Sequence, residues 1–316
     1  MYSDIVVIGS LNMDMVVNVK KRPQVGETII GHDFFMSPGG KGANQAYAAS
    51  LLGGSVAMVG CVGSDIFGYS LKEHLSKGGV NIAHIEEIQN EASGLAFITL
   101  DSDGNNSIIV APGANQHVTP TLVEEKEDII SHAKLLIVQL EIPLESVMTA
   151  VKLAKKHNVP VLLDPAPAQP LPNELLEMID YITPNETEIY QLTGIEVNDT
   201  KSAQVAAVSL IEKGVKTVFA KMGEKGVTVV KSNRTYYVEG NKVQAVDTTA
   251  AGDSFSGAVG VALVEGKDVW SAAHFGNAVA ALVVTKKGAQ SSMPTKKEVE
   301  TFLQEKANGK GTNLRG

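Results

Sequence analysis

The sequence predicts an α/β protein: a doubly wound, mostly parallel sheet with helices on both faces, plus a small β-sheet that serves as a lid. The first observation is that short apolar runs alternate with amphipathic segments along the 316 residues. This alternation is typical of a parallel sheet covered on both faces. The second is that residues 12–35 and 93–110 have β character without a crossover helix. Strands from these two distant segments can pair into a separate sheet, and such a sheet beside an α/β core would be a lid.

Each element follows from its local pattern. The predicted buried strands are short apolar runs, at residues 5–8, 56–61, 135–138, 161–163, 217–220 and 227–230. The predicted helices lie between them, at residues 41–52, 66–76, 121–131, 144–157, 186–192 and 202–212, followed by two Ala- and Gly-rich helices at 252–264 and 269–284. Residues 101–105, Asp-Ser-Asp-Gly-Asn, have a hairpin-turn pattern. We expect a single domain over residues 1–306, with lid strands at about 12–38 and 93–110 and a disordered tail at 307–316.

Composition argues against several classes of protein. The chain has 27 Lys+Arg and 35 Asp+Glu, a net charge of −8, so a nucleic-acid partner is not expected. The single cysteine, Cys61, cannot form an internal disulfide or a Cys-rich zinc site, and its apolar surroundings predict a buried hydrophobe. No apolar run approaches the ~18 residues of a membrane span. The N-terminus lacks the basic segment of a signal peptide. We therefore expect a cytoplasmic protein without a membrane partner.

The segment 247–258, Asp-Thr-Thr-Ala-Ala-Gly-Asp-Ser-Phe-Ser-Gly-Ala, opens the first of the two Ala- and Gly-rich helices. Free N–H groups and the helix dipole at such an end bind anions, and small residues let a ligand approach the backbone. Asp253 would then lie where a phosphoryl group is transferred, and its carboxylate could accept a hydroxyl proton. The alternative is that Asp253 only complements the helix dipole, as first-turn acids commonly do.

The segment 37–46, Ser-Pro-Gly-Gly-Lys-Gly-Ala-Asn-Gln-Ala, places three glycines at the start of a predicted helix. Asn44 would project from its first turn, and an amide that both donates and accepts hydrogen bonds suits sugar hydroxyls. Asn12 and Asp14 stand two apart on a predicted strand, so both face one side and could hold neighbouring hydroxyls. The alternatives are an ordinary Gly-rich helix entry and two solvated polar residues on an edge strand.

These two segments resemble the signatures of the PfkB family of carbohydrate kinases. Residues 38–46 are similar to the N-terminal signature, and residues 247–258 are similar to the C-terminal one, with its Ala-Ala-Gly-Asp core at 250–253. Four more motifs in family order resemble the ribokinase group within the family. They are Gly-Ser-Leu-Asn-Met-Asp at 9–14, Gln-Leu-Glu-Ile-Pro at 139–143, Thr-Pro-Asn-Glu-Thr-Glu at 183–188 and Lys-Gly-Ala-Gln at 287–290.

The resemblance implies a ribokinase-like fold and an ATP-dependent sugar kinase. The implied reaction transfers the γ-phosphoryl group of ATP to the 5-hydroxyl of D-ribose and gives D-ribose 5-phosphate. The resemblance also implies a homodimer in which the lids of two subunits clasp each other. By position, Asp253 would be the general base, and the backbone of Ala250, Ala251 and Gly252 would form the anion hole. Three acceptors other than ribose stay open, namely 2-deoxyribose, fructose and a nucleoside, as does a sugar-binding regulator without catalysis.

The resemblance also assigns residues to ligands. The sugar would be held by Asn12, Met13, Asp14, Gly40, Lys41, Gly42, Ala43, Asn44, Glu141 and Asp253, although Glu141 could instead be a solvated loop acid. ATP would be held by Asn185, Lys221, Met222, Gly223, Glu224, Lys225, Gly226, Gly252, Asp253 and Asn277, with Lys221 and Lys225 supplying charge rather than chemistry. Asn185 and Glu188 would support Mg²⁺, directly or through water, unless Asn185 is only a helix cap. An activating K⁺ would be held, mostly by backbone carbonyls, in a loop containing Asp247, Thr249, Val283, Lys286, Gly288 and Ser292, unless Asp247 is only a turn residue.

Overall fold

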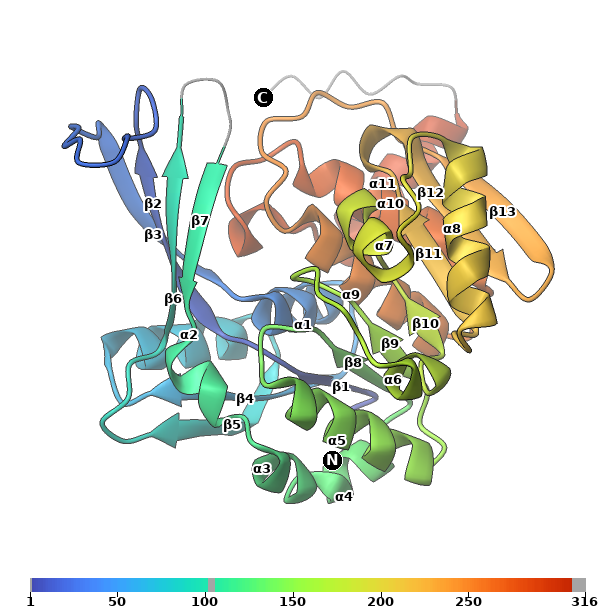
Figure 1. The fold of residues 1–316 in the computed structure, drawn as a ribbon, viewed down its shortest axis with the longest axis horizontal. Helices are drawn as coiled ribbons and strands as arrows, with labels where there is room; N and C mark the ends of the chain where they lie inside the picture. The colour runs from blue at the N-terminus through green and yellow to red at the C-terminus, as the bar shows by residue number, and fades with distance from the viewer. Residues whose placement is uncertain (1, 102–105, 309–316) are drawn as a thin grey trace.

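The computed structural model describes residues 2–101 and 106–308, and its strands form two sheets (Figure 1). The larger has nine strands in the order β13-β12-β11-β10-β9-β8-β1-β4-β5. The pairs from β11 through β5 are parallel, and β12 and β13 complete the sheet in antiparallel pairs. The predicted fold class is confirmed. The strands of the larger sheet are β1 Ile5–Ile8, β4 Val56–Gly63, β5 Asn81–Ile88, β8 Leu135–Val138, β9 Val161–Leu163, β10 Tyr181–Ile182, β11 Thr217–Lys221, β12 Gly226–Lys231 and β13 Arg234–Glu239.

Helices cover both faces of the large sheet, because its central strands are apolar on both sides. Successive side chains of a strand point to opposite faces. Accordingly Ile5 and Val7 pack into one core and Val6 and Ile8 into the other. The first core is closed by α1 Lys41–Leu51, α2 Ile66–Lys77, α9 Ala251–Val264, α10 Val269–Val283 and α11 Lys296–Ala307. The second is closed by α3 Pro120–Glu124, α4 Glu127–Ser131, α5 Leu144–Lys156, α6 Asn173–Glu177, α7 Glu186–Thr193 and α8 Thr200–Glu212.

The smaller sheet has the strand order β3-β2-β6-β7 and stands apart from the large sheet (Figure 1). Its strands are β2 Asn12–Asn18, β3 Asp33–Gly39, β6 Gly94–Leu100 and β7 Asn106–Ala111. The prediction that two distant segments pair into a separate sheet is confirmed, since β2 pairs in parallel with β6 and antiparallel with β3. In this register Asn12 lies between Gly39 and Gly94. Three residues separate β1 from β2, so the small sheet begins at the carboxyl end of the large one.

Some elements differ from the sequence expectations. The helix expected at 121–131 is two short helices, because Lys126 has a non-helical backbone (φ −99°, ψ 12°) between them. Strands β5, β10 and β13 and helices α6 and α11 were not expected. Helix α11 ends at Ala307, inside the segment expected to be a disordered tail; residues 309–316 of that tail and residues 102–105 of the predicted turn lie outside the described residues. Within the described part of the chain, no helix has the length and apolar character to cross a membrane.

Candidate active site

The two signature segments meet where α1 and α9 begin. Asp253, in the first turn of α9, is 7% exposed, and its Oδ2 accepts a hydrogen bond of 2.8 Å from Nδ2 of Asn44 in the first turn of α1. The other end of the Asn44 amide is also fixed, because its Oδ1 accepts a bond of 3.0 Å from Nε2 of Gln290. Both side chains are therefore held in place by residues far apart in the sequence. The alternative in which Asp253 only complements the helix dipole does not account for this bond.

The surroundings of Asp253 make its carboxylate a stronger base than a solvated one. Burial raises the pKa of Asp253, and the nearby carboxylates of Asp164 and Glu141 raise it further. The ammonium of Lys41 and the bond from Asn44 oppose this rise, but the pKa remains above its usual value. A general base works best when its pKa approaches the working pH. The position therefore suits proton acceptance from a hydroxyl.

The start of α9 is open to an anion. Its N-cap, Ala250, has a left-handed backbone (φ 58°), and no side chain among the described residues caps this end. The first N–H groups of a helix have no acceptor within the helix, and the helix dipole adds positive potential there. The N–H of Ala251 donates to the carbonyl of Thr248 at a long 3.3 Å, a bond for which a phosphate oxygen at residues 250–252 can compete.

Glu141, in the loop that follows β8, is hydrogen-bonded to several of the residues predicted to hold the sugar. Its Oε2 accepts hydrogen bonds from Ser10 Oγ at 2.6 Å and from the backbone N–H of Lys41 at 3.2 Å, and a longer one from Asn12 Nδ2 at 3.4 Å. Asn12 is fixed on its other side, because its Oδ1 accepts a bond of 2.8 Å from Asn115 Nδ2. Glu141 is half-buried in its loop, and the alternative of a solvated loop acid does not account for these three bonds.

Asn12 and Asp14 are 2% and 8% exposed, so they are not solvated residues of an edge strand. Burial, followed by the charges of Glu141 and Asp253, raises the pKa of Asp14 to about 7, although Lys41 lowers it. The pKa of Lys41 is itself raised: burial lowers it, but the charges of Asp253, Glu141 and other acids outweigh that effect. These mutual influences place Asp14, Lys41, Glu141 and Asp253 in one cluster.

The glycines before α1 are required by packing within the chain. A Cβ on Gly39 would clash with the carboxylate of Asp14, and one on Gly42 would lie 2.7 Å from the carbonyl carbon of Gly9. Gly40 has a φ of 88°, which side chains rarely adopt. Met13 and Ala43, also predicted to hold the sugar, have buried side chains in the hydrophobic core.

The predicted magnesium residues form a helix cap. Oδ1 of Asn185 accepts a bond of 2.8 Å from the Glu188 N–H, and the Glu188 carboxylate accepts bonds from both the N–H and Nδ2 of Asn185. These reciprocal bonds form a capping box, so Asn185 does cap helix α7, as the alternative reading of the sequence proposed. Burial, with Asp164, raises the pKa of Glu188, while Lys221 lowers it.

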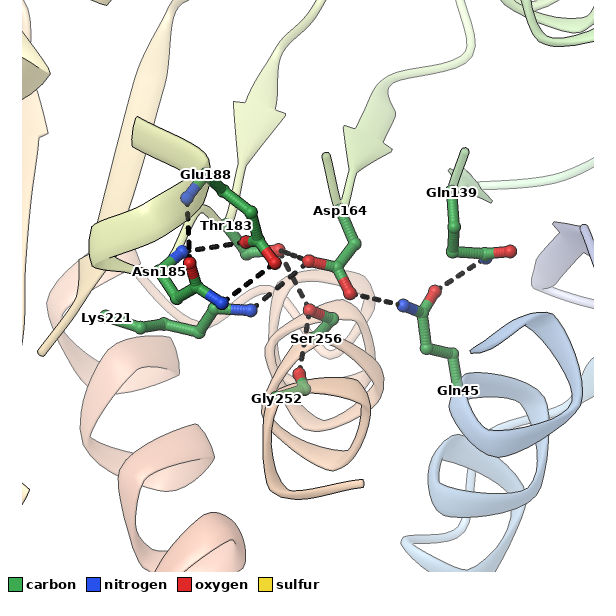
Figure 2. A network of polar contacts seen from close by, with 9 residues as sticks. All are labelled: Gln45, Gln139, Asp164, Thr183, Asn185, Glu188, Lys221, Gly252 and Ser256. Carbon is green, nitrogen blue, oxygen red and sulfur yellow. Dashed lines mark hydrogen bonds and ion pairs between the residues drawn. The ribbon is translucent and has the colours of Figure 1, made fainter. Parts of the chain in front are cut away.

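Asp164 is the main residue of this region that the sequence reasoning missed (Figure 2). It is 1% exposed and accepts bonds from Gln45 Nε2 at 2.8 Å, Thr183 Oγ1 at 3.3 Å and Lys221 Nζ at 3.2 Å. Its signal was present, because it directly follows the predicted strand 161–163, and ligands of open α/β sheets bind at the carboxyl ends of strands. Asn115, which orients Asn12, also went unpredicted and carries no comparable signal.

The other residues predicted to hold ATP lie in the turn after β11 and on α10, and two of them, Lys225 and Asn277, donate hydrogen bonds to backbone carbonyls. Gly223–Lys225 form a short 3₁₀ helix after β11, and Met222 is buried in the core. Lys225 Nζ donates to the carbonyl of Asn198 at 2.7 Å. Asn277 on α10 donates from Nδ2 to the carbonyl of Glu239 at 2.8 Å, so its amide holds the end of β13. Glu224 and Gly226 lie in the same turn, where Gly226 has a φ of 104°.

The predicted cation loop is closed around Asp247. Its Oδ1 accepts from the N–H and Oγ1 of Thr249 at 2.9 and 2.6 Å, and its Oδ2 accepts from the N–H of Gly288 at 2.9 Å. Burial opposes ionisation, but these bonds lower the pKa of Asp247. Lys286 points away to Glu298, at 3.1 Å, and Ser292 donates to the carbonyl of Ala289; Val283 ends α10 beside them. Over residues 2–101 and 106–308 no cluster of three acidic, His or Cys side chains could hold a metal ion.

Known proteins resemble this chain over nearly its whole length. Residues 3–296 match the family model described as pfkB family carbohydrate kinase. A ribokinase of Haemophilus influenzae is 46% identical over 304 residues, which cover 96% of this chain and 99% of that protein. A deoxyribokinase of Salmonella typhi is 37% identical, with 95% of this chain and 98% of that protein covered. The structure of an Arabidopsis thaliana ribokinase with ribose and ATP is similar, with a TM-score of 0.90, 37% identity and coverage of 96% and 99%.

Proposed function

Since this chain belongs to the pfkB family of carbohydrate kinases, we propose that it phosphorylates D-ribose at the 5-hydroxyl to give D-ribose 5-phosphate. The chain is an ATP-dependent sugar kinase, and the choice of ribose is the proposal. The observation that carries the proposed chemistry is the bond of 2.8 Å between Asn44 and Asp253, which joins the start of α1 to the start of α9. A sugar hydroxyl at the Asp253 carboxylate would have a base beside it and a phosphate site at the start of α9.

In the proposed reaction Asp253 accepts the proton of the 5-hydroxyl. The hydroxyl oxygen forms a bond to the γ-phosphorus, the bond from that phosphorus to the bridging oxygen breaks, and its electron pair leaves on ADP. The transition state of such a transfer is loose, so proton acceptance comes late and the base chiefly positions the hydroxyl. The N–H groups of Ala251 and Gly252 would donate to the transferring phosphoryl oxygens at the start of α9, and Ala251 would give up its 3.3 Å bond to the carbonyl of Thr248 for this contact.

The sugar site has the groups to bind several hydroxyls. The amides of Asn12 and Asn44 and the carboxylates of Asp14 and Glu141 offer both donors and acceptors, and most are buried. A site built to hydrogen-bond a hydroxyl discriminates against an analogue that lacks it. This arrangement supports ribose over 2-deoxyribose. The resemblance to a deoxyribokinase keeps 2-deoxyribose as the second candidate acceptor.

Two cations belong to the proposal, and the donor atoms present fit both. Both oxygens of the Glu188 carboxylate accept bonds from Asn185, so Asn185 and Glu188 would hold Mg²⁺ through water, which this ion usually keeps. Mg²⁺ bound to ATP would neutralise phosphate charge. The loop at Asp247 would hold K⁺ by one carboxylate and backbone carbonyls, a set of ligands that suits this ion. K⁺ would order the adjacent residues 250–253.

The homodimer and the cytoplasmic location are also proposals. The small sheet exposes large apolar side chains, and contiguous apolar surface marks interaction sites. Those exposed by more than two fifths lie on both faces of the sheet, with Phe34, Met36, Phe97 and Ile109 on one face and Phe35, Ile108 and Val110 on the other. A second copy of the sheet would cover one of these faces. Light scattering should give twice the chain mass of 33.4 kDa, and a monomer at all concentrations would reject the dimer.

An acceptor screen tests the proposed function. ADP release is measured with D-ribose, 2-deoxyribose, fructose and a nucleoside, each with ATP and Mg²⁺ in potassium and in sodium buffer. We expect the highest kcat/KM with D-ribose and a higher rate in potassium. A higher kcat/KM with another sugar would reassign the acceptor. Binding of ribose in calorimetry without any turnover would support a regulator instead of a kinase.

A further inference from the structure

Lys221, the last residue of β11, places a buried cation beside the start of α9 (Figure 2). Its side chain is 12% exposed, and its Nζ lies 3.2 Å from Asp164 Oδ1. The same Nζ lies 3.2 Å from the point where a Cβ on Gly252 would stand. The ammonium is thus adjacent to the backbone at the open end of α9. Burial lowers the pKa of Lys221, but Asp164 and Glu188 raise it more, so the side chain stays charged.

Asp164 is held from several elements at once, so the ion pair is fixed. Gln45 Nε2 donates to one oxygen, and Gln139 Nε2 in turn donates to Gln45 Oε1 at 2.6 Å. Thr183 Oγ1 donates to the other oxygen and also contacts Ser256 Oγ of α9 at 2.8 Å. The carboxylate therefore connects β9, α1, β11 and α9, as Figure 2 shows.

Helix α1 positions two carboxylates through consecutive residues. Asn44 donates to Asp253 and Gln45 donates to Asp164, each at 2.8 Å. The first contact orients the proposed base. The second orients the group that holds the Lys221 ammonium. One helix turn thus fixes both the base and the cation relative to the start of α9.

The carboxylates near the start of α9 carry negative charge that a phosphoryl group would increase, so a cation there would be stabilising. The site gathers the carboxylates of Asp14, Glu141, Asp164, Glu188 and Asp253. An incoming phosphoryl group adds further negative charge, which the backbone N–H groups of α9 offset only in part. Fixed positive charge aimed at the place where charge develops is a main source of rate in phosphoryl transfer. Stability alone does not account for the buried Lys221–Asp164 pair, because apolar residues can often replace a buried ion pair at little cost in stability.

We propose that Lys221 is a catalytic residue that contacts the transferring phosphoryl group at the start of α9, and that Asp164 is the positioning residue that holds it there. The inference rests on the proposed function and deepens it. Lys221 is thereby given a role in the chemistry, beyond the general positive charge expected from the sequence.

Four variants and one control test this inference by ADP release, with ribose affinity from calorimetry. Lys221→Met should lower kcat by about 10²-fold, the size of effect seen on loss of an electrostatic stabiliser, and leave the ribose Kd within about twofold. Lys221→Arg should recover most of the loss, and Asp164→Asn should lower kcat by about tenfold. The control is Lys216→Met, which breaks an ion pair with Asp180 at the other end of β11 (2.8 Å) and should keep kcat.

The double variant Lys221→Met, Asp164→Asn separates catalysis from structure. It removes both members of the Lys221–Asp164 ion pair, so neither is left as an unpaired buried charge, and it should fold even if Lys221→Met alone does not. A kcat as low as that of Lys221→Met supports the inference, because the cation is still missing. Recovery of near-normal kcat would overturn it, since the lysine would then serve only to neutralise Asp164. Wild-type kcat in Lys221→Met would overturn it equally.

The outcome can be separated from a failure of the proposed function. If the wild type phosphorylated no sugar, the proposed function would fail by itself. The affinity for ATP, measured by calorimetry, would still test Lys221. A loss of about tenfold in Lys221→Met beside an unchanged Kd in Lys216→Met supports a phosphate contact. Equal Kd values in both variants and the wild type would reject it.

Discussion

Replacing Asp14 by Asn should stabilise the protein at neutral pH and weaken its sugar binding. Burial, with Glu141 and Asp253, raises the pKa of Asp14 from 3.8 to about 7. The folded chain therefore keeps a proton that the unfolded chain releases between these two pH values. Because the folded state binds more protons in this window, its stability falls as the pH rises. Asn mimics the protonated acid and is free of this loss.

The size of the effect follows from the pKa difference. The interval is 7 − 3.8 = 3.2 pH units. At 1.36 kcal/mol per unit, the penalty for ionising Asp14 is roughly 4 kcal/mol once the pH exceeds 7. Asp14→Asn should therefore gain up to that amount over the wild type at pH 8. At the same time the loss of a charged acceptor should weaken ribose binding by about 10- to 100-fold.

Denaturant unfolding of both proteins from pH 5 to pH 8 measures the gain, and calorimetry measures the ribose affinity. Asp180→Asn is the matched control: burial opposes ionisation, but bonds from Lys155 and Lys216 lower the pKa of Asp180, so this variant should lose stability. The reasoning about Asp14 is refuted if Asp14→Asn is less stable than the wild type at pH 8. It is equally refuted if the difference between them does not grow with pH.

Three further predictions concern the start of α9, the glycine turn and the cation loop. Asp253→Asn should lower kcat by 10²- to 10⁴-fold while calorimetry still detects ribose binding, and near-normal ADP release would remove Asp253 as the base. Gly42→Ala should destabilise the fold by about 1–3 kcal/mol in denaturant unfolding, since its Cβ would lie 2.7 Å from the backbone of Ser10; unchanged stability would show that the turn can yield. Asp247→Ala should abolish the stimulation of ADP release by potassium over sodium, and a variant that kept full stimulation would place the cation elsewhere.

The sequence was informative where chemistry and local pattern coincide. The apolar run at Ile5–Ile8 predicted a buried strand, and the structure places it between β4 and β8. The small residues before Asp253 predicted an open helix start, and Ala250 provides it. Edge strands were harder, because β13, Arg234–Glu239, is largely exposed and its sequence has no continuous apolar run.

Contacts between segments that are distant in the sequence limited how much of the site could be predicted. Asn115 orients Asn12 from 103 residues away, and a local pattern contains no trace of that bond. Asp164 followed a predicted strand and could have been found, but its partner Lys221 lies 57 residues further on. Asn185 looks like a helix cap and like a metal residue in the sequence, and the capping box shows only the first of these. Such contacts form between side chains at the carboxyl ends of different strands. They can be identified only once the fold shows which strands are neighbours.

Phosphorus NMR of the product formed from D-ribose and ATP tests the central claim most directly. A phosphate on the 5-hydroxyl couples to the two protons of one CH₂ group, so the wild type should give a triplet. Asp253→Asn, which still binds ribose, should give almost none of it in the same time. A doublet, which indicates a phosphate on a carbon with a single proton, or an equal triplet from Asp253→Asn would contradict the account.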